Sequence, residues 1–219
     1  MRRRPEPELM DLPEEARVYA QADFTEVNRA FVDRALKLAG DGQNLRVLDL
    51  GTGPAAIPIL IAEARPTWQI TALDVSEPML LIARAAITSA GVGDRVRVPL
   101  ADAKSTGLPD ASFDLIISNS LLHHMPDPAP LWREIKRLAA PRALVFLRDL
   151  MRPRSPEQAR RLVQLHALAE PKLLQEEFHR SLLAAFTVEE VREQLRAAKL
   201  RSLNVQIVSD RHLDVLGRV

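Results

Sequence analysis

Apolar residues in the middle of the chain alternate between short continuous runs and longer stretches with helical spacing. The short runs are rich in Val, Ile and Leu and span residues 45–50, 69–74, 96–100, 113–118 and 143–148. Strands that alternate with helices form βαβ units, in which the strands lie parallel and the helices cover both faces of the sheet. The pattern therefore predicts an α/β domain around an open, mostly parallel sheet.

Two further apolar runs lie near the end of the sequence. Residues 203–208 and 212–216 are separated only by Ser209, Asp210 and Arg211, which is typical of a hairpin. This hairpin would extend the sheet to seven strands, with the last strand antiparallel to the others.

The helical segments around these strands divide the predicted single domain into four parts. Thr187 and Glu190 form a capping-box pattern, and Ser76 can cap another helix. We predict a helical N-terminal lid at residues 1–43, a ligand-binding core at 44–150, a helical insert and crossover at 151–200, and the hairpin at 201–219. Two roles are open for the insert: part of the ligand crevice, or additional packing surface.

Composition narrows the classes of partner. The 219 residues carry 30 Lys and Arg against 29 Asp and Glu, so no strong field favours nucleic acid or an anionic membrane. The basic start, Arg2 to Arg4, is expected to be a solvated tail. The absence of cysteine excludes disulfides and thiolate metal sites. No apolar run has the length of a signal peptide or a membrane span, so we expect a cytoplasmic protein.

The strand at 45–50 leads directly into a glycine turn. Gly51 and Gly53 permit a tight turn and a close approach of a ligand to the backbone. With Ala56 they also fit a dinucleotide fingerprint, for which Asp74 would contact a ribose. Asp49 discriminates between the two types of ligand, because a carboxylate here repels a pyrophosphate and attracts a cationic amino acid.

This loop resembles the first motif of the class I S-adenosylmethionine (SAM)-dependent methyltransferases, acidic-x-Gly-x-Gly-x-Gly, with Ala55 at the third glycine. The resemblance covers most of residues 45–147 and is closest to the ubiquinone-biosynthesis-like, small-molecule branch. It implies a Rossmann-like sheet, SAM as cofactor and S-adenosylhomocysteine as product. The expected cofactor-binding residues are Asp49, Gly51, Gly53, Asp74, Val75, Met79, Asp102, Ala103, Asn119, Ser120 and Tyr19.

Each of these assignments has a structural alternative. The resemblance places Asp74 at the ribose hydroxyls and Asp102 near the adenine amino group, but Asp74 could instead cap a helix and Asp102 could close a turn. Tyr19 could contact the methionine end of the cofactor or pack against Phe24. Acidic residues that follow successive strands in the family's order favour the cofactor interpretation.

The candidate catalytic residues are His123 and His124, which follow the fourth strand. Methyl transfer is an in-line displacement that needs a base only if the acceptor must lose a proton. Either imidazole could accept that proton, with Asp127 orienting one of them; the alternative is a structural turn. Adjacent histidines with Asp127 do not match an established ligand spacing, so no metal site is predicted.

Candidate substrate contacts lie at and beyond the fifth strand, at Arg148, Asp149 and His166. Arg148 and Arg152 could instead form ion pairs with Asp149. The segment from Asn119 to Leu122 lacks the Asn/Asp-Pro-Pro-aromatic motif of many methyltransferases that act on nucleobases or glutamine.

These features favour transfer of a methyl group to a small molecule, without nucleic-acid or membrane partners. Two other functions are open. One is a non-catalytic, SAM-binding partner or regulatory subunit. The other is an NAD-dependent oxidoreductase, which Asp49 disfavours.

Overall fold

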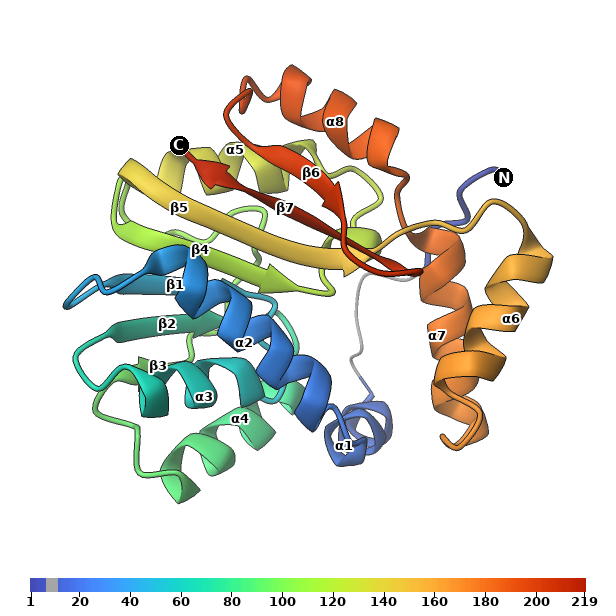
Figure 1. Cartoon of the computed structure of the whole chain (residues 1–219). Coiled ribbons are helices and arrows are strands. Elements are labelled where there is room, and N and C mark those ends of the chain that lie inside the picture. The colour runs from blue at the N-terminus through green and yellow to red at the C-terminus, as the bar shows by residue number, and fades with distance from the viewer. Residues whose placement is uncertain (7–11) are drawn as a thin grey trace.

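The computed structural model describes residues 1–6 and 12–219, and the core of this part is a seven-stranded sheet (Figure 1). The strand order is β3-β2-β1-β4-β5-β7-β6, and β7 is antiparallel to both of its neighbours. The predicted Rossmann-like sheet with a closing hairpin is thereby confirmed. The strands are β1 (Arg46–Leu50), β2 (Gln69–Leu73), β3 (Val96–Arg97), β4 (Phe113–Asn119), β5 (Ala139–Leu150), β6 (Asn204–Ile207) and β7 (His212–Arg218).

The third strand is shorter than the apolar run predicts. Only Val96 and Arg97 pair with β2, and the chain then leaves the sheet. Leu100 returns to form a single bridge with Asp74, with its side chain exposed. Because β3 is the edge strand, one of its sides has no neighbouring strand to extend the pairing.

Helices cover both faces of the sheet because side chains in each strand point alternately to the two sides. Val47 faces a layer formed by α2 (Thr25–Ala39), α3 (Ala56–Ala64) and α4 (Glu77–Ser89). Leu48 and Leu50 face the opposite layer, which contains α5 (Ala129–Leu138) and α8 (Val188–Ala197). The near-continuous apolar strands of the sequence are thus explained by burial on both sides.

The predicted N-terminal lid does not include α2, because α2 belongs to the packed layer. Phe31 of α2 is fully buried and stacks on Phe146 of β5, with 4.7 Å between ring centroids. Burial of this apolar stripe against the sheet fixes α2 in the core. The shorter α1 (Pro13–Gln21) contacts α4 instead. A lid role therefore applies at most to α1 and the first six residues.

The insert after β5 forms a helical pair with its own small core. Leu162 of α6 (Pro156–His166) packs with Leu182 and Leu183 of α7 (Lys172–Ala184) and with Leu150. The pair projects from the edge where β4 and β5 end, and α7 contacts the short 3-10 helix η1 (Leu122–His124) (Figure 1). The insert therefore lies beside η1 at the carboxyl end of β4 and also supplies packing surface.

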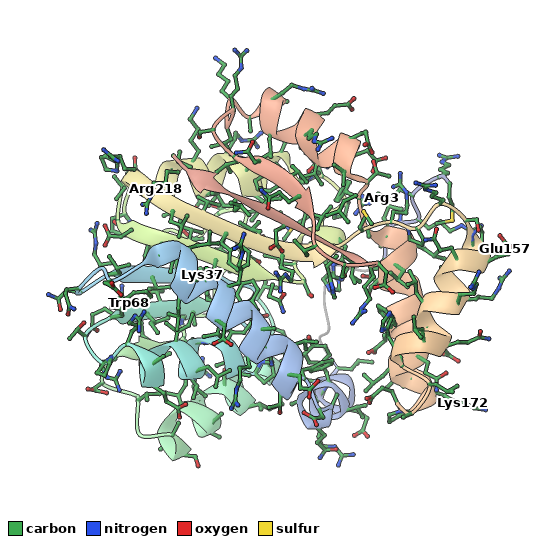
Figure 2. All side chains as sticks on the ribbon, in the orientation of Figure 1. Arg3, Lys37, Trp68, Glu157, Lys172 and Arg218 are labelled. Atoms are coloured by element: carbon green, nitrogen blue, oxygen red, sulfur yellow. The ribbon has the colours of Figure 1, made fainter. Side chains whose placement is uncertain are left out.

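The basic start of the chain is docked, and the expectation of a solvated tail is wrong. The Arg3 guanidinium donates to the carbonyl oxygens of His123 and Met125, at 2.9 and 2.8 Å, and to that of Ala184. It also stacks 3.8 Å from the centroid of the Phe186 ring. Figure 2 shows Arg3 where the chain start meets α7.

Among the residues that the structure describes, no helix combines the length and apolar character that crossing a bilayer requires.

Candidate active site

The glycine turn between β1 and α3 is shaped by left-handed backbone conformations. Gly51 has a φ of 71°, and a Cβ there would lie 2.8 Å from a methyl carbon of Leu121, so the turn requires glycine. Gly53 also has a positive φ, but a Cβ there would meet nothing within 4 Å. Space is therefore open beside the Gly53 backbone for a ligand. Ala55, at the family's third glycine, takes the left-handed conformation with a φ of 66°.

Asp49 supplies a buried carboxylate beside this turn. Asp49 is 2% exposed, and its Oδ2 has no hydrogen-bond partner among the described residues. Burial raises the pKa of Asp49 to about 7, because the charged form loses hydration. An unpartnered carboxylate of this kind fits a cationic group of a ligand.

Asp74 ties the glycine turn to the start of α4. Its Oδ2 accepts a hydrogen bond from the Gly53 amide at 2.8 Å, and its Oδ1 accepts one from the Ser76 amide at 2.9 Å. Ser76 is the N-cap of α4, as its sequence position predicts. Burial raises the pKa of Asp74 despite these bonds. Each carboxylate oxygen can accept a further bond, so the ribose assignment and the loop-tying role are compatible.

The other expected cofactor residues differ in their burial and in the contacts they make. Asp102 accepts a bond from the Lys104 amide at 2.8 Å, so it does close a turn. Tyr19 packs against Phe24 at 5.0 Å, and burial together with the charge of Asp74 raises its pKa to about 12. The remaining residues are Val75 (exposed), Met79 and Ala103 (buried), and Asn119 and Ser120 (half-buried, at the end of β4).

The two candidate catalytic histidines lie in η1, directly after β4. His123 is buried, and its Nδ1 lies 2.6 Å from Asp149 Oδ1. Asp149 also accepts hydrogen bonds from the amides of Leu122 and Leu150. Burial acts against both charges, but their mutual attraction lowers the pKa of Asp149 and raises that of His123. His123 is therefore held firmly through Nδ1.

Asp127 is not the residue that orients a histidine, and this prediction is wrong. Its carboxylate is exposed and accepts a hydrogen bond from the Ala129 amide at 3.0 Å, at the start of α5. The orienting carboxylate is Asp149, which the sequence predicts as a substrate contact or as an ion-pair partner of Arg148 and Arg152. The signal for this role is its position at the carboxyl end of β5, which is the strand adjacent to β4.

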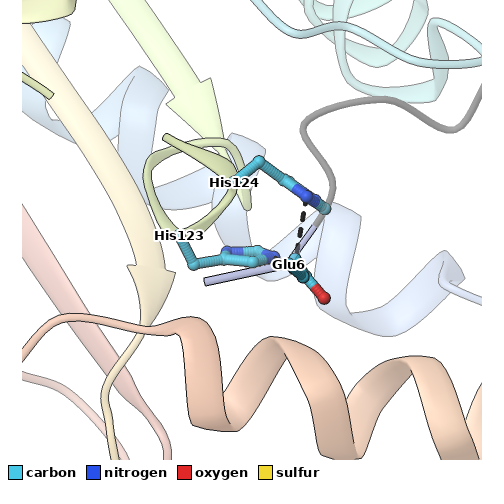
Figure 3. A group of neighbouring side chains, drawn as sticks. All are labelled: Glu6, His123 and His124. Atoms are coloured by element: carbon cyan, nitrogen blue, oxygen red, sulfur yellow. Dashed lines mark ion pairs between the residues drawn. The ribbon is translucent and has the colours of Figure 1, made fainter. Parts of the chain in front are cut away.

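Glu6, which no sequence pattern indicated, lies beside the two histidines because the chain start is docked there (Figure 3). Its Oε1 lies 3.6 Å from His123 Nε2 and 3.2 Å from His124 Nδ1. The Ser181 hydroxyl of α7 donates to the same carboxylate at 3.1 Å. Burial raises the pKa of Glu6, although the charge of His123 opposes this. No local motif marks a residue that acts across more than a hundred positions of the chain.

Two of the predicted substrate contacts are engaged elsewhere. Arg148 forms two hydrogen bonds with the buried Asp214 of β7, at 2.7 and 2.9 Å, and not with Asp149. His166 lies 2.7 Å from Asp210 in the hairpin turn. Arg152, the other arginine expected near Asp149, binds Glu190 at 2.6 Å. Side chains on adjacent positions of β5 point to opposite faces, which is why Asp149 reaches the site and Arg148 does not.

Comparisons with known proteins identify a methyltransferase domain in this chain. A family model described as a methyltransferase domain matches residues 48–147. A 27-O-demethylrifamycin SV methyltransferase of Amycolatopsis mediterranei is 32% identical over 78% of this chain and 58% of its own length. A release factor glutamine methyltransferase of Chlorobaculum tepidum is 38% identical over 45% of this chain and 35% of its own length. The chain thus spans about a third to rather more than half of these relatives.

Solved structures show the same fold. A putative SAM-dependent methyltransferase from Methanococcus maripaludis superposes with a TM-score of 0.71 and 20% identity, covering 98% of this chain and 96% of its own.

Proposed function

Residues 48–147 of this chain belong to the class I SAM-dependent methyltransferase family, and from this premise we propose that the protein transfers a methyl group from SAM to a small molecule. The observation that carries the proposal is the buried Asp49 carboxylate beside the glycine turn. Its Oδ2 has no partner among the described side chains, and SAM has an ammonium group that would supply one.

The residues present fit this cofactor along the carboxyl edge of the sheet. Asp49 would hold the amino-acid ammonium, and Asp74 would accept from the ribose hydroxyls. The open space at Gly53 would allow close approach to the backbone. Asp102 and Ala103 would contact the adenine, Val75 and Met79 would border the ribose side, and Tyr19 would lie at the methionine end. When bound, SAM supplies an activated methyl group on a positive sulfur.

The protein's own contribution at the acceptor end is orientation and proton transfer. Asn119 and Ser120 end β4 beside η1, which places the two histidines at the same edge. His123 is fixed by Asp149 through Nδ1, and its Nε2 and His124 Nδ1 both face Glu6, so a proton taken from an acceptor would pass to this group of three residues. This step is needed only if the acceptor is a hydroxyl or another protonated nucleophile.

A small molecule is the acceptor class that the site favours. The rifamycin relative is named for a small-molecule substrate, and the glutamine methyltransferase relative is named for a protein substrate. The segment after β4 in this chain is Asn119-Ser120-Leu121-Leu122, without the paired prolines expected for an amide or nucleobase amine. The near-zero net charge likewise gives no support to a nucleic-acid partner.

Calorimetric titration of the purified protein tests the cofactor. We expect SAM and S-adenosylhomocysteine to bind with micromolar affinity and NAD not to bind. Asp49→Asn should weaken SAM binding by about 10-fold or more, because a hydrogen bond to a charged group contributes about 1.5–3 kcal/mol. Asp127→Asn, which changes an exposed carboxylate at α5, is the matched control.

Binding of NAD in place of SAM would refute the proposal, as would a folded protein that binds neither sulfur nucleoside. Turnover in an acceptor screen then separates an enzyme from a non-catalytic SAM-binding subunit.

A further inference from the structure

Glu6, His123 and His124 together form a group of metal-ligand atoms, which we term the Glu-His-His cluster (Figure 3). One ligand atom from each residue lies within 4.8 Å of the other two. The Glu6 oxygen lies 3.6 Å from His123 Nε2 and 3.2 Å from His124 Nδ1. Ligands bonded tetrahedrally to zinc at 2.0–2.1 Å lie about 3.3 Å apart. The two distances from Glu6 to the histidines are therefore close to the ligand–ligand distance of a formed zinc site.

The outer contacts of the cluster are those that orient metal ligands. His123 Nδ1 is held by Asp149 at 2.6 Å, which directs Nε2 toward Glu6. A carboxylate on the far nitrogen of a histidine is the usual second shell of a metal-bound imidazole, where it fixes the ring and raises its basicity. Ser181 donates to the Glu6 carboxylate at 3.1 Å and holds it from the α7 side. Two of the three ligands are thus supported by neighbouring elements.

We propose that Glu6, His123 and His124 bind a divalent first-row transition metal ion, with Zn²⁺ as the preferred ion. Two imidazoles and one carboxylate suit Zn²⁺ or Co²⁺, whereas Mg²⁺ and Ca²⁺ favour all-oxygen sites. Three protein ligands leave a fourth position for water or a ligand, as in catalytic zinc sites. The sequence alone did not predict this site because its third ligand comes from the chain start.

The position of the cluster gives the metal a role in the reaction, and this role rests on the proposed function. The cluster follows β4 at the edge where the acceptor would bind. A hydroxyl bound at the fourth position would have a lowered pKa, so it would release its proton to solvent water near neutral pH. Its oxygen would then form a bond to the methyl carbon of SAM while the bond from that carbon to the sulfur breaks, and S-adenosylhomocysteine would leave. The substrate class would then be a small molecule with a hydroxyl or enol oxygen.

Metal binding is tested on the full chain after treatment with a chelator and dialysis, with neither SAM nor an acceptor present. Titration with Co²⁺ should saturate at one equivalent and give the visible absorption bands of a four- or five-coordinate ion, which Zn²⁺ should then displace. Asp149→Asn removes the charge that holds His123 through Nδ1 and should weaken Co²⁺ binding about 10- to 100-fold. Glu6→Gln removes a ligand charge but keeps an oxygen that accepts from Ser181, and it should weaken Co²⁺ binding at least as much.

Two further variants complete the test. His124→Gln removes a ligand and should abolish saturable binding. His166→Gln removes a histidine that pairs with Asp210 outside the cluster, and it should bind Co²⁺ like the wild type. Circular dichroism and thermal unfolding verify that each variant is folded.

The outcomes separate this proposal from the proposed function. Absence of saturable Co²⁺ and Zn²⁺ binding by the wild type would overturn the metal site, as would equal binding by Glu6→Gln and His124→Gln. The Glu-His-His cluster would then be an ion-paired contact that holds the chain start. A protein that binds Co²⁺ but not SAM supports the metal site and refutes the cofactor proposal. A protein that binds SAM but not Co²⁺ supports the cofactor proposal and refutes the metal site.

Discussion

Three carboxylates, the buried Asp49 and Asp149 and the half-buried Glu6, differ in how their charge is balanced. Asp149 is matched by His123 and two backbone amides. Glu6 faces His123, His124 and the Ser181 hydroxyl. Asp49 has an oxygen without a hydrogen-bond partner in the described part of the chain, and its pKa is raised to about 7. The residue with the least compensated charge is thus the one assigned to a cationic ligand.

The raised pKa of Asp49 predicts a specific pH dependence of stability. Between about pH 4 and pH 7 the unfolded chain has released this proton while the folded chain keeps it, so the ligand-free protein loses stability as pH rises across that window. Asp49→Asn removes this loss. We expect the variant to exceed the wild type in unfolding free energy by on the order of 2 kcal/mol at pH 8.

Urea unfolding at pH 4.5, 6 and 8 measures the effect of Asp49→Asn, with Asp127→Asn as the exposed control. If the unfolding free energies of the wild type and of Asp49→Asn change with pH in parallel, the predicted effect of the Asp49 pKa is contradicted.

Gly51 and Gly40 offer a matched pair of substitutions. Both have a φ of 71°, at which an L side chain is strained, so alanine at either position should cost about 1–3 kcal/mol of stability. Only at Gly51 does the added Cβ meet Leu121, at 2.8 Å, whereas at Gly40 it meets nothing within 4 Å. We expect similar losses in thermal stability, but a large loss of SAM affinity only for Gly51→Ala. Unchanged SAM binding by Gly51→Ala would remove this turn from the cofactor site.

At the scale of elements, the crevice is formed by pieces from opposite ends of the chain. Residues 1–6 pack between η1 and the end of α7, and Arg3 joins the two by donating to carbonyls on both sides. The α7 helix contributes Ser181 to Glu6. Because η1 carries both histidines, the docked chain start fixes the geometry of the Glu-His-His cluster from its exposed side.

Arg3 should account for much of this docking. Arg3→Ala removes several charge-assisted hydrogen bonds and the contact with Phe186, so we expect a loss of about 1–2 kcal/mol in unfolding free energy. Hydrogen exchange should also increase in η1. Arg2→Ala changes an exposed neighbour and serves as the control. Equal effects of the two substitutions in urea unfolding and exchange would show that Arg3 does not hold the segment.

At the scale of the whole molecule, the proposed cofactor site joins β1, β2, β4 and the α1 region along one edge of the sheet. A ligand bound there stabilises all of these elements together, because it binds only the folded chain. At a SAM concentration of 100 times its Kd, the gain is about 2.7 kcal/mol. For a chain of 219 residues this predicts a rise in Tm of roughly 5–10 °C.

Differential scanning calorimetry with SAM, and with NAD at the same concentration, measures this shift. No rise with SAM at saturating concentration would contradict binding to the native fold. A rise with NAD alone would indicate a dinucleotide site.

The sequence by itself determined the features that depend on neighbouring residues. The strand segments, the glycine turn, the Ser76 cap and the Thr187 capping box all follow from local periodicity and turn chemistry, and the structure contains each of them. The candidate cofactor residues share one edge of the sheet because parallel strands bring successive carboxyl ends together.

Tertiary structure decided which distant groups meet. The partners of His123 come from β5 and from the chain start, Arg148 turns to Asp214, and α2 packs on the sheet instead of covering the crevice. Hydrophobic periodicity shows that one face of an element is buried, but not which element covers it. A charged side chain likewise does not specify its partner until packing has fixed both positions.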